Sequence, residues 1–197
     1  MSARVVICRH GNTFDRGQIV TRVGGRTDLP LSRSGEAQAT ALGQHFASWD
    51  FARAYTSDLK RTRETLARIV GGEPEVRPFL REIDYGPDEN QPEAVVVARL
   101  GQAAIDAWDA RGALPDGWVM DVDGVRAAWA AFMDEQARAG STAIVMTSNG
   151  VARFVFSALG LDPGAHSIKL RTGAYGVLEH DGAEWSVTDW NLRPPAI

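Results

Sequence analysis

An arginine and a histidine stand side by side near the start of the chain, and together they could bind and attack an anion. Arg9 and His10 follow the apolar run 5–8 and precede Gly11. A guanidinium binds oxyanions through its planar N–H groups, and an imidazole can act as a nucleophile. Two polar residues at the end of a strand can also simply face water, and this alternative is open for the pair alone.

A second candidate group, residues 56–65, is rich in hydroxyl and cationic side chains. It is expected to follow a strand and to begin a helix, whose N-terminal amide groups favour a phosphate. Arg61 is expected on the first helical turn, where its side chain could reach back over the edge of a sheet. Arg63 is expected on a different face, toward solvent or an acid. A solvated basic helix face is the alternative for both.

Both groups are expected at one edge of an α/β sheet, where ligands of such sheets bind beside the carboxyl ends of the strands. The apolar run 5–8 has the length of a buried strand, and Gly11 ends it. Strands are predicted at 4–8, 53–56, 75–78 and 143–147, with a terminal hairpin at 174–180 and 184–190. Helices are predicted at 35–48, 59–70, 92–110, 123–139 and 149–160, with Ser32 or Ser34 capping the first and Ser57 or Asp58 the second.

This alternation predicts an α/β fold with three layers, αβα, around a mostly parallel central sheet. The length of 197 residues suits a single domain, residues 1–197. Residues 83–91 are predicted to form a loop. Residues 85–125, interrupted by Pro115 and Gly117, are predicted to be an insertion that caps the site.

The composition is that of an ordinary globular domain, with 44% hydrophobic and 23% charged residues. The net charge of −4 argues against nucleic acid as a partner. Residues 1–70 nevertheless hold 11 Lys and Arg against 6 Asp and Glu, so a local positive field could attract a small anionic substrate. Because no segment approaches about 20 consecutive apolar residues, no membrane span is expected.

A single cysteine, Cys8, lies in the first predicted strand. It is expected to be a small core residue, which suits a reducing cytoplasm. Residues 1–4 lead directly into that strand without the layout of a signal peptide. The expected location is therefore cytoplasmic.

Three motifs together resemble a known family. Arg9-His10-Gly11 comes first, Gly25-Arg26-Thr27-Asp28-Leu29-Pro30-Leu31-Ser32-x-x-Gly35-x-x-Gln38-Ala39 follows, and Leu59-x-Arg61-Thr62-x-x-Thr65 comes third. In this order they resemble the histidine phosphatase superfamily, in the branch that contains phosphoglycerate mutases and small acid phosphatases. The likeness runs along nearly the whole chain and implies a phosphoglycerate mutase-like fold.

The resemblance implies a role for each matching residue. His10 would be the nucleophile that becomes phosphohistidine, and Arg9 and Arg61 would bind the phosphoryl oxygens. Positioned guanidinium groups stabilise the charge of a transferring phosphoryl group, and they also disfavour a protonated imidazole. No cofactor or metal is implied. The histidines offer no metal-ligand spacing to suggest one: His10, His45, His166 and His180.

Segment 80–86 resembles the family segment that carries the catalytic glutamate, which corresponds to Glu82. Such an acid must protonate the leaving alcohol. Asp84 is a local competitor, and a simple ion pair between Glu82 and Arg81 is the alternative. Further along, where the family usually has tryptophan, an acid and glycine, this chain has Asp88, Glu89 and Asn90, so the loop bordering the substrate is altered.

The second histidine of the family is replaced here. It normally opens the helix after the penultimate strand, and the corresponding residue is Asn149. Asparagine offers only a neutral N–H₂ donor, and loss of one transition-state donor costs about 3 kcal/mol. A plain Asn-Gly turn is the alternative. The remaining histidines are not expected to substitute, with His166 in a predicted loop the least unfavourable.

We predict a metal-independent phosphomonoesterase that acts on a small phosphorylated substrate, with Asn12 and Thr13 as donors at the pocket rim and Ser148 beside Asn149 on the opposite wall. The first alternative is a pseudo-phosphatase that binds a phosphorylated ligand without efficient turnover. The second is a phosphoglycerate mutase-type phosphotransferase, which the short chain and the altered loop disfavour. A purely structural role has little support. A homodimer is possible.

Overall fold

The computed structural model describes residues 2–163 and 167–195, and its strands form a six-stranded sheet in the order β3-β2-β4-β1-β5-β6. The first four strands of this order pair in parallel, whereas β1–β5 and β5–β6 are antiparallel. The mostly parallel sheet predicted from the sequence is therefore confirmed. The strands are β1 (Ala3–Arg9), β2 (Arg53–Thr56), β3 (Glu75–Val76), β4 (Thr142–Thr147), β5 (Tyr175–His180) and β6 (Trp185–Leu192).

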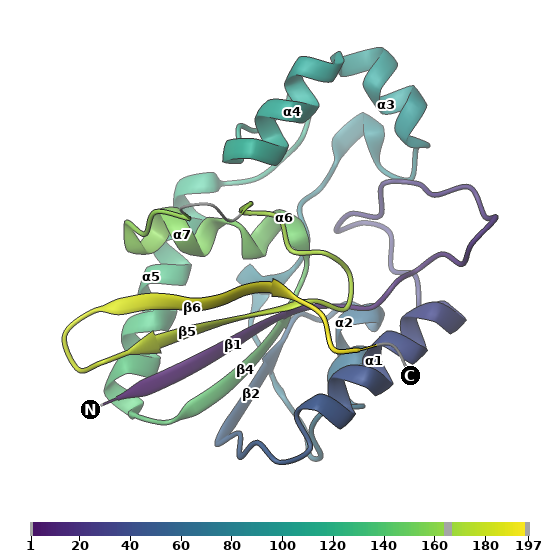
Figure 1. Ribbon diagram of the computed structural model, residues 1–197. Coiled ribbons are helices and arrows are strands. Elements are labelled where there is room, and N and C mark those ends of the chain that lie inside the picture. Colours follow the sequence, from purple (N-terminus) through teal and green to yellow (C-terminus); the bar gives the residue numbers. More distant parts are fainter. Residues whose placement is uncertain (1, 164–166, 196–197) are drawn as a thin grey trace.

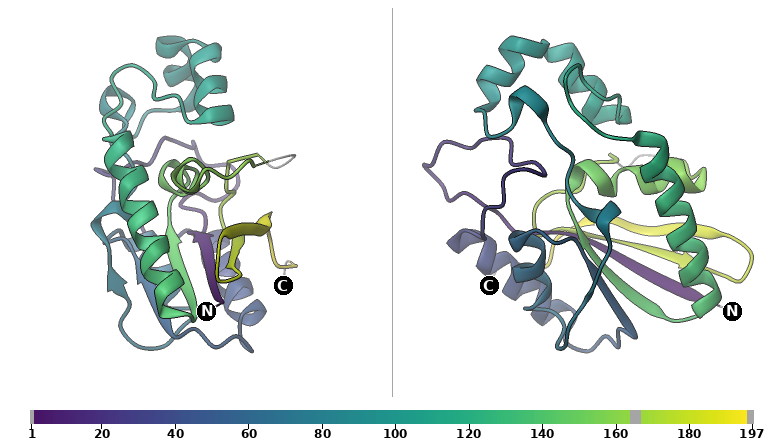
Figure 2. Two further views of the ribbon diagram at one scale, coloured as in Figure 1. Left: turned by 90° about the vertical axis from the view of Figure 1, so that its left-hand side faces the viewer. Right: turned by 180° about the vertical axis from the view of Figure 1, so that it is seen from behind.

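Helices cover both faces of the sheet, giving three layers (Figures 1 and 2). Along β1 the side chains alternate between the two faces. Val6 and Cys8 pack with residues of α1 and α2, whereas Val5 and Ile7 belong to the core that includes α5 and α7. The helices are α1 (Arg33–His45), α2 (Lys60–Leu66), α3 (Glu93–Leu100), α4 (Gln102–Arg111), α5 (Val122–Ala139), α6 (Asn149–Ala152) and α7 (Phe154–Leu159).

The strand register brings the predicted site segments to one edge. Arg9 at the end of β1 pairs with Thr147 at the end of β4, and the His10 N–H donates to the Thr147 carbonyl at 3.2 Å. Thr56 at the end of β2 pairs with Met146. The residues that follow these three strands must therefore emerge side by side. Helices α3 and α4 lie beyond this edge, above the sheet in Figure 1.

Several predicted helices are divided or end earlier than the sequence suggested: the one predicted at 35–48 ends at His45, and the one predicted at 149–160 is divided into α6 and α7 at Arg153. The helix predicted at 92–110 is broken into α3 and α4 by Gly101, whose φ of +81° only glycine adopts readily. The helix predicted at 59–70 ends at Leu66, because the chain then tightens into turns with i→i+3 hydrogen bonds, such as Ile69 N–H to the Leu66 carbonyl.

Helix capping was predicted correctly for the first helix and wrongly for the second. Ser32 caps α1, its hydroxyl accepting from the Gly35 N–H at 3.2 Å. For α2, neither of the two residues proposed for it is the N-cap. The Lys60 N–H donates to the carboxylate of Asp28 at 2.7 Å, and Asp58 pairs with Arg81 instead. A residue of a distant loop, Asp28, thus supplies the hydrogen-bond acceptor for α2 that the adjacent residues were expected to supply.

The described helices include none that is both long and apolar enough to cross a bilayer. Cys8 is fully buried, as predicted, and its burial raises the pKa of the thiol.

Candidate active site

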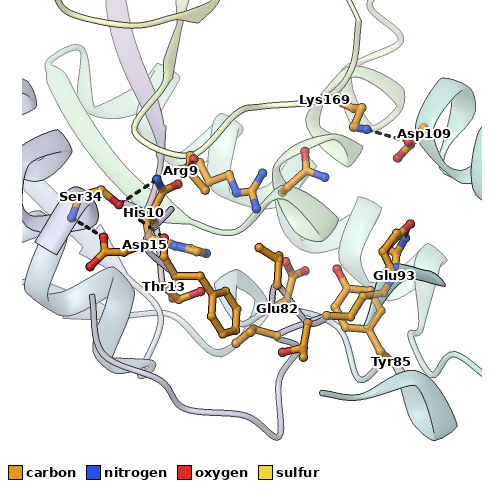
Figure 3. A pocket seen from close by; sticks show the side chains of 18 of the residues that line it. Arg9, His10, Thr13, Asp15, Ser34, Glu82, Tyr85, Glu93, Asp109 and Lys169 are labelled. Carbon is orange, nitrogen blue, oxygen red and sulfur yellow. Dashed lines mark hydrogen bonds and ion pairs between the residues drawn. The ribbon is translucent and has the colours of Figure 1, made fainter. Parts of the chain in front are cut away.

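A pocket of about 690 Å³ opens at the carboxyl edge of the parallel strands. Its lining contains six of the eight residues proposed from the sequence; of the other two, Arg61 contacts His10 and Ser148 is buried. In Figure 3, Arg9, His10 and Glu82 face the centre of this pocket, with the Lys169–Asp109 pair some way from them on another side. The six lining residues are Arg9, His10, Asn12, Thr13, Glu82 and Asn149.

His10 is held in one tautomer. Its Nδ1 lies 2.7 Å from the carbonyl oxygen of Gly11. Because a carbonyl oxygen can only accept, Nδ1 must carry the proton, and Nε2 therefore presents a lone pair. This lone pair accepts from the Arg61 Nε–H at 3.2 Å. The imidazole nitrogen available for bond formation is thus Nε2.

The surroundings of His10 keep it neutral. The side chain is buried, and burial together with the charges of Arg61 and Arg9 lowers its pKa well below the ordinary 6.5. A neutral imidazole keeps its lone pair, which is the condition for nucleophilic attack.

The depressed pKa of His10 also predicts a pH dependence of stability. Below pH 6.5 the unfolded chain binds a proton that folded His10 does not, so the free energy of unfolding should fall by about 1.4 kcal/mol per pH unit from this group. The loss should continue down to the folded pKa of His10. Urea unfolding between pH 5 and 7, compared with His10→Asn, isolates the effect because the variant lacks this titration. Parallel stability curves for the two proteins would contradict it.

Arg61 is fixed in the fold by backbone carbonyls. It is fully buried, and its Nη1 and Nη2 atoms donate to the carbonyls of Thr27 at 2.8 Å and Gly24 at 3.1 Å. Burial lowers its pKa, with nearby carboxylates acting in the opposite direction. Arg9 is oriented in a similar way, since its Nη1 donates to the Leu170 carbonyl at 2.9 Å. Arg63 is exposed, as the sequence predicted.

Three supporting residues were not assigned roles from the sequence. Thr65 accepts from the Gly11 N–H at 3.1 Å, and Thr62 bonds to Ser57 at 2.7 Å. Glu89 accepts from the N–H groups of Gly24 and Tyr85, at 3.1 and 3.0 Å. Thr62 and Thr65 belong to the third sequence motif, and Glu89 stands where the family usually has an acid, so all three were visible in the sequence. Their structural role is to hold the segments around His10 and Arg61.

Glu82 is the carboxylate of segment 80–86 that reaches the pocket. It is buried and accepts from the N–H groups of Ile83 at 3.0 Å and Gly150 at 3.3 Å. Asp84 instead pairs with Arg26 at 2.8 Å. The suggested Glu82–Arg81 ion pair is not formed, because Arg81 binds Asp58.

The close approach of Gly150 to Glu82 gives a second prediction. A Cβ at residue 150 would overlap the Oε1 atom of Glu82. Gly150→Ala should therefore displace the carboxylate and lower kcat by about 10²-fold, with little change in KM. Steady-state kinetics with an alkyl phosphate measure this. Gly71→Ala is the matched control, because a Cβ there meets open space. Unchanged kcat in Gly150→Ala would show that the position of Glu82 is not critical.

Asn149 presents an amide donor to the pocket. Its Oδ1 accepts from the Leu170 N–H at 2.8 Å, which fixes the amide so that the NH₂ group faces the other way. Leu170 thus orients Arg9 through its carbonyl and Asn149 through its N–H. Nothing in the side chain of Leu170 signals this role, because both contacts are made by the backbone.

The other candidates take different places. Asn12 lines the rim, but its amide bonds to Ser34 at 3.2 Å and to Thr172 at 2.5 Å. Thr13 lines the rim. Ser148 is fully buried behind Asn149 and is not among the lining residues. His45 and His180 lie outside the pocket lining, as expected, and His166 falls outside the described residues.

The altered loop at 88–90 is organised by other contacts. Asp88 is buried and binds the indole N–H of Trp118 at 2.7 Å and Arg99 Nε at 2.8 Å. Asn90, at the family's glycine position, has φ of +59°, a left-handed conformation that asparagine tolerates better than most residues. The changed residues therefore still build an ordered loop. Across the described part of the chain, no group of three or more His, Cys, Asp or Glu side chains is placed to hold a metal ion.

Comparison with known proteins finds a family model that matches most of the chain. The model of the histidine phosphatase superfamily (branch 1) matches residues 5–193. A relative from Photorhabdus laumondii, named Probable phosphoglycerate mutase GpmB, is 28% identical over 195 residues, which cover 95% of this chain and 89% of the relative.

Solved structures share the fold. A mycobacterial glucosyl-3-phosphoglycerate phosphatase superposes with a TM-score of 0.78 at 21% identity, covering 97% of this chain and 99% of that one. A phosphoglycerate mutase from Bacillus anthracis gives a TM-score of 0.79 at 19% identity, covering 96% and 93%. The predicted phosphoglycerate mutase-like α/β architecture is thereby confirmed.

Proposed function

This chain belongs to the histidine phosphatase superfamily (branch 1), and we propose that it is a phosphomonoesterase that works without a metal, through a phosphohistidine formed at His10. One observation carries the proposal. The Nε2 lone pair of a neutral His10 stands beside two guanidinium groups in a pocket that also contains the carboxylate of Glu82. Nucleophile, anion-binding groups and acid are thus within one site.

In the first step, Nε2 of His10 attacks the phosphorus atom. The N–P bond forms as the bond from phosphorus to the ester oxygen breaks, and that oxygen takes a proton from Glu82. Arg9 and Arg61 stabilise the charge on the equatorial oxygens. In the second step, Glu82 takes a proton from water, which attacks the phosphohistidine. The N–P bond breaks, and neutral His10 and inorganic phosphate result.

Helices α3 and α4 are proposed to serve as the cap expected from segment 85–125, within a single domain. Glu93 of α3 and Trp108 and Asp109 of α4 line the pocket, so these helices border any bound ester. The cytoplasmic location and the homodimer remain predictions made from the sequence.

The amide of Asn149 is proposed to donate to a phosphoryl oxygen in place of a charged imidazole. Asn149→His should raise kcat for an aryl phosphate by about tenfold to a hundredfold, since a charged donor is stronger than a neutral one. Asn149→Asp is the matched control and should lower activity, because it replaces the donor by a negative charge. A lower kcat in Asn149→His would contradict this role.

Hydrolysis of 4-nitrophenyl phosphate by the wild-type chain, in the presence of a metal chelator, tests the proposed function. Turnover that is unaffected by the chelator is expected. Asn149 is the observation that favours the pseudo-phosphatase alternative. Binding of inorganic phosphate without turnover of aryl or alkyl esters would favour that alternative over the esterase.

A further inference from the structure

The outer part of the pocket carries two ion pairs whose members all belong to the lining. Arg22 Nη2 lies 2.6 Å from Glu93 Oε1, and Lys169 Nζ lies 2.6 Å from Asp109 Oδ2. The second pair is drawn in Figure 3. These cations could otherwise meet a second anionic group of a substrate, but each is already neutralised by a carboxylate.

Arg22 is also held by aromatic rings. Its guanidinium carbon lies 4.8 Å from the ring centroid of Trp118 and 5.6 Å from that of Tyr85, and only 14% of its side chain is exposed. A cation stacked and paired in this way has little freedom to turn toward a ligand.

The charges of the described lining residues balance. The acidic members Asp15, Glu82, Glu93 and Asp109 face the cationic members Arg9, Arg16, Arg22 and Lys169. Arg61, beneath the pocket, adds one positive charge at the phosphate end. When Glu82 is protonated, as the proposed first step requires, the surplus is two positive charges, and a phosphate dianion already neutralises it. Arg16 is exposed, and water and salt screen its charge.

Part of the remaining lining is apolar or aromatic, beside hydroxyl groups such as those of Thr21 and Thr172. Phe14 and Val20 contribute from the loop after β1, Tyr85 from the altered loop and Trp108 from α4. Such side chains contact an uncharged group favourably but offer nothing to a desolvated charge.

From these observations we infer that the pocket selects phosphate monoesters whose organic part is uncharged, and that Glu93 and Asp109 are specificity-determining residues that exclude a second anion. The inference rests on the proposed function and names its substrate class. A second carboxylate or phosphoryl group would meet the carboxylates of Glu93 and Asp109, whose ion-pair partners Arg22 and Lys169 are already neutralised. The selection disfavours substrates that carry two anionic groups.

Calorimetric titration with two matched probes tests the inference without requiring turnover. The probes are 4-carboxybenzylphosphonate and 4-carbamoylbenzylphosphonate, which have the same shape and differ by one charge. Wild-type protein should bind the carbamoyl probe about fivefold more tightly, the size of one charge contact near water. Equal affinities, or tighter binding of the carboxylate, would overturn the inference.

A variant that gains affinity for the carboxylate probe provides the stronger test. In the double variant Glu93→Gln/Asp109→Asn, the cations of Arg22 and Lys169 lose their counter-charges, and the preference should reverse to about fivefold for the carboxylate probe. Asp106→Asn is the control, because Asp106 is an exposed acid of α4 that bonds to Gln102 and is not part of the lining. A double variant that folds and keeps the wild-type preference would overturn the assignment of these two residues.

Inorganic phosphate is titrated first to separate the two hypotheses. A wild-type chain that fails to bind phosphate would count against the proposed function and with it the inference. Phosphate binding combined with equal affinity for the two probes would overturn the inference alone. The wild-type comparison is decisive even if the double variant does not fold.

Discussion

His10→Ala is expected to lower phosphate-ester turnover by at least about 10⁴-fold, the scale seen when a catalytic nucleophile is removed. The variant loses Nε2, the proposed nucleophilic atom, which accepts a hydrogen bond from Arg61. The proposed anion-binding residues Arg9 and Arg61 are held mainly by backbone carbonyls, so inorganic phosphate should still bind. Turnover of 4-nitrophenyl phosphate and calorimetric phosphate binding measure the two effects separately.

The matched control is His45→Ala, which removes a histidine that lies outside the pocket lining. Rapid denaturation of wild-type protein during turnover should also trap a phosphoryl group on His10, detectable as a mass increase in its peptide. Retained turnover in His10→Ala, or a phosphoryl group on a different residue, would show that the nucleophile is wrongly assigned.

Glu82→Gln is expected to produce a loss that depends on the leaving group. The amide can still accept a hydrogen bond from Ile83 or Gly150, but it can no longer supply a proton. For an alkyl phosphate, kcat should fall by about 10²- to 10⁴-fold. For 4-nitrophenyl phosphate the first step should be much less affected, because nitrophenolate leaves without protonation.

Comparing the two esters identifies the role of Glu82. Asp84→Asn is the control, since Asp84 is the neighbouring carboxylate and pairs with Arg26 rather than facing the pocket. Equal losses of kcat/KM for both esters in Glu82→Gln would indicate that Glu82 only supports the structure of the site, because kcat/KM reports the first step and not the hydrolysis of the phosphohistidine.

The part of the site that could be predicted consists of side chains that act directly from strand ends. Arg9 and His10 follow an apolar strand, and Asn149 begins the helix after another. Their positions follow from the rule that parallel strands end at a common edge. The sheet at the centre of the three-layer fold was predictable for the same reason, because its strands are the clearest apolar runs in the chain.

The unpredicted part depends on contacts between residues far apart in the sequence. Asp28 binds the first amide of α2, a task assigned to the adjacent Ser57 or Asp58. Asp88 accepts a hydrogen bond from Trp118, thirty positions away, and this contact orders the loop whose sequence differs from the family pattern. Gly101 breaks a helix that its neighbours favour. Local patterns do not encode which distant group will satisfy a polar atom.

Leu170 links the end of the pocket that contains Arg9 and Asn149 to the interior of the protein. Its N–H and carbonyl orient Asn149 and Arg9, while its side chain is fully buried in the core that includes α5 and α7. A cavity or an overpacked side chain near residue 170 would therefore shift two proposed anion-binding groups as well as weaken the fold. A substitution near Leu170 would then change thermal stability and catalytic efficiency together. An evolving or engineered variant could not improve one of these properties at this position without also affecting the other.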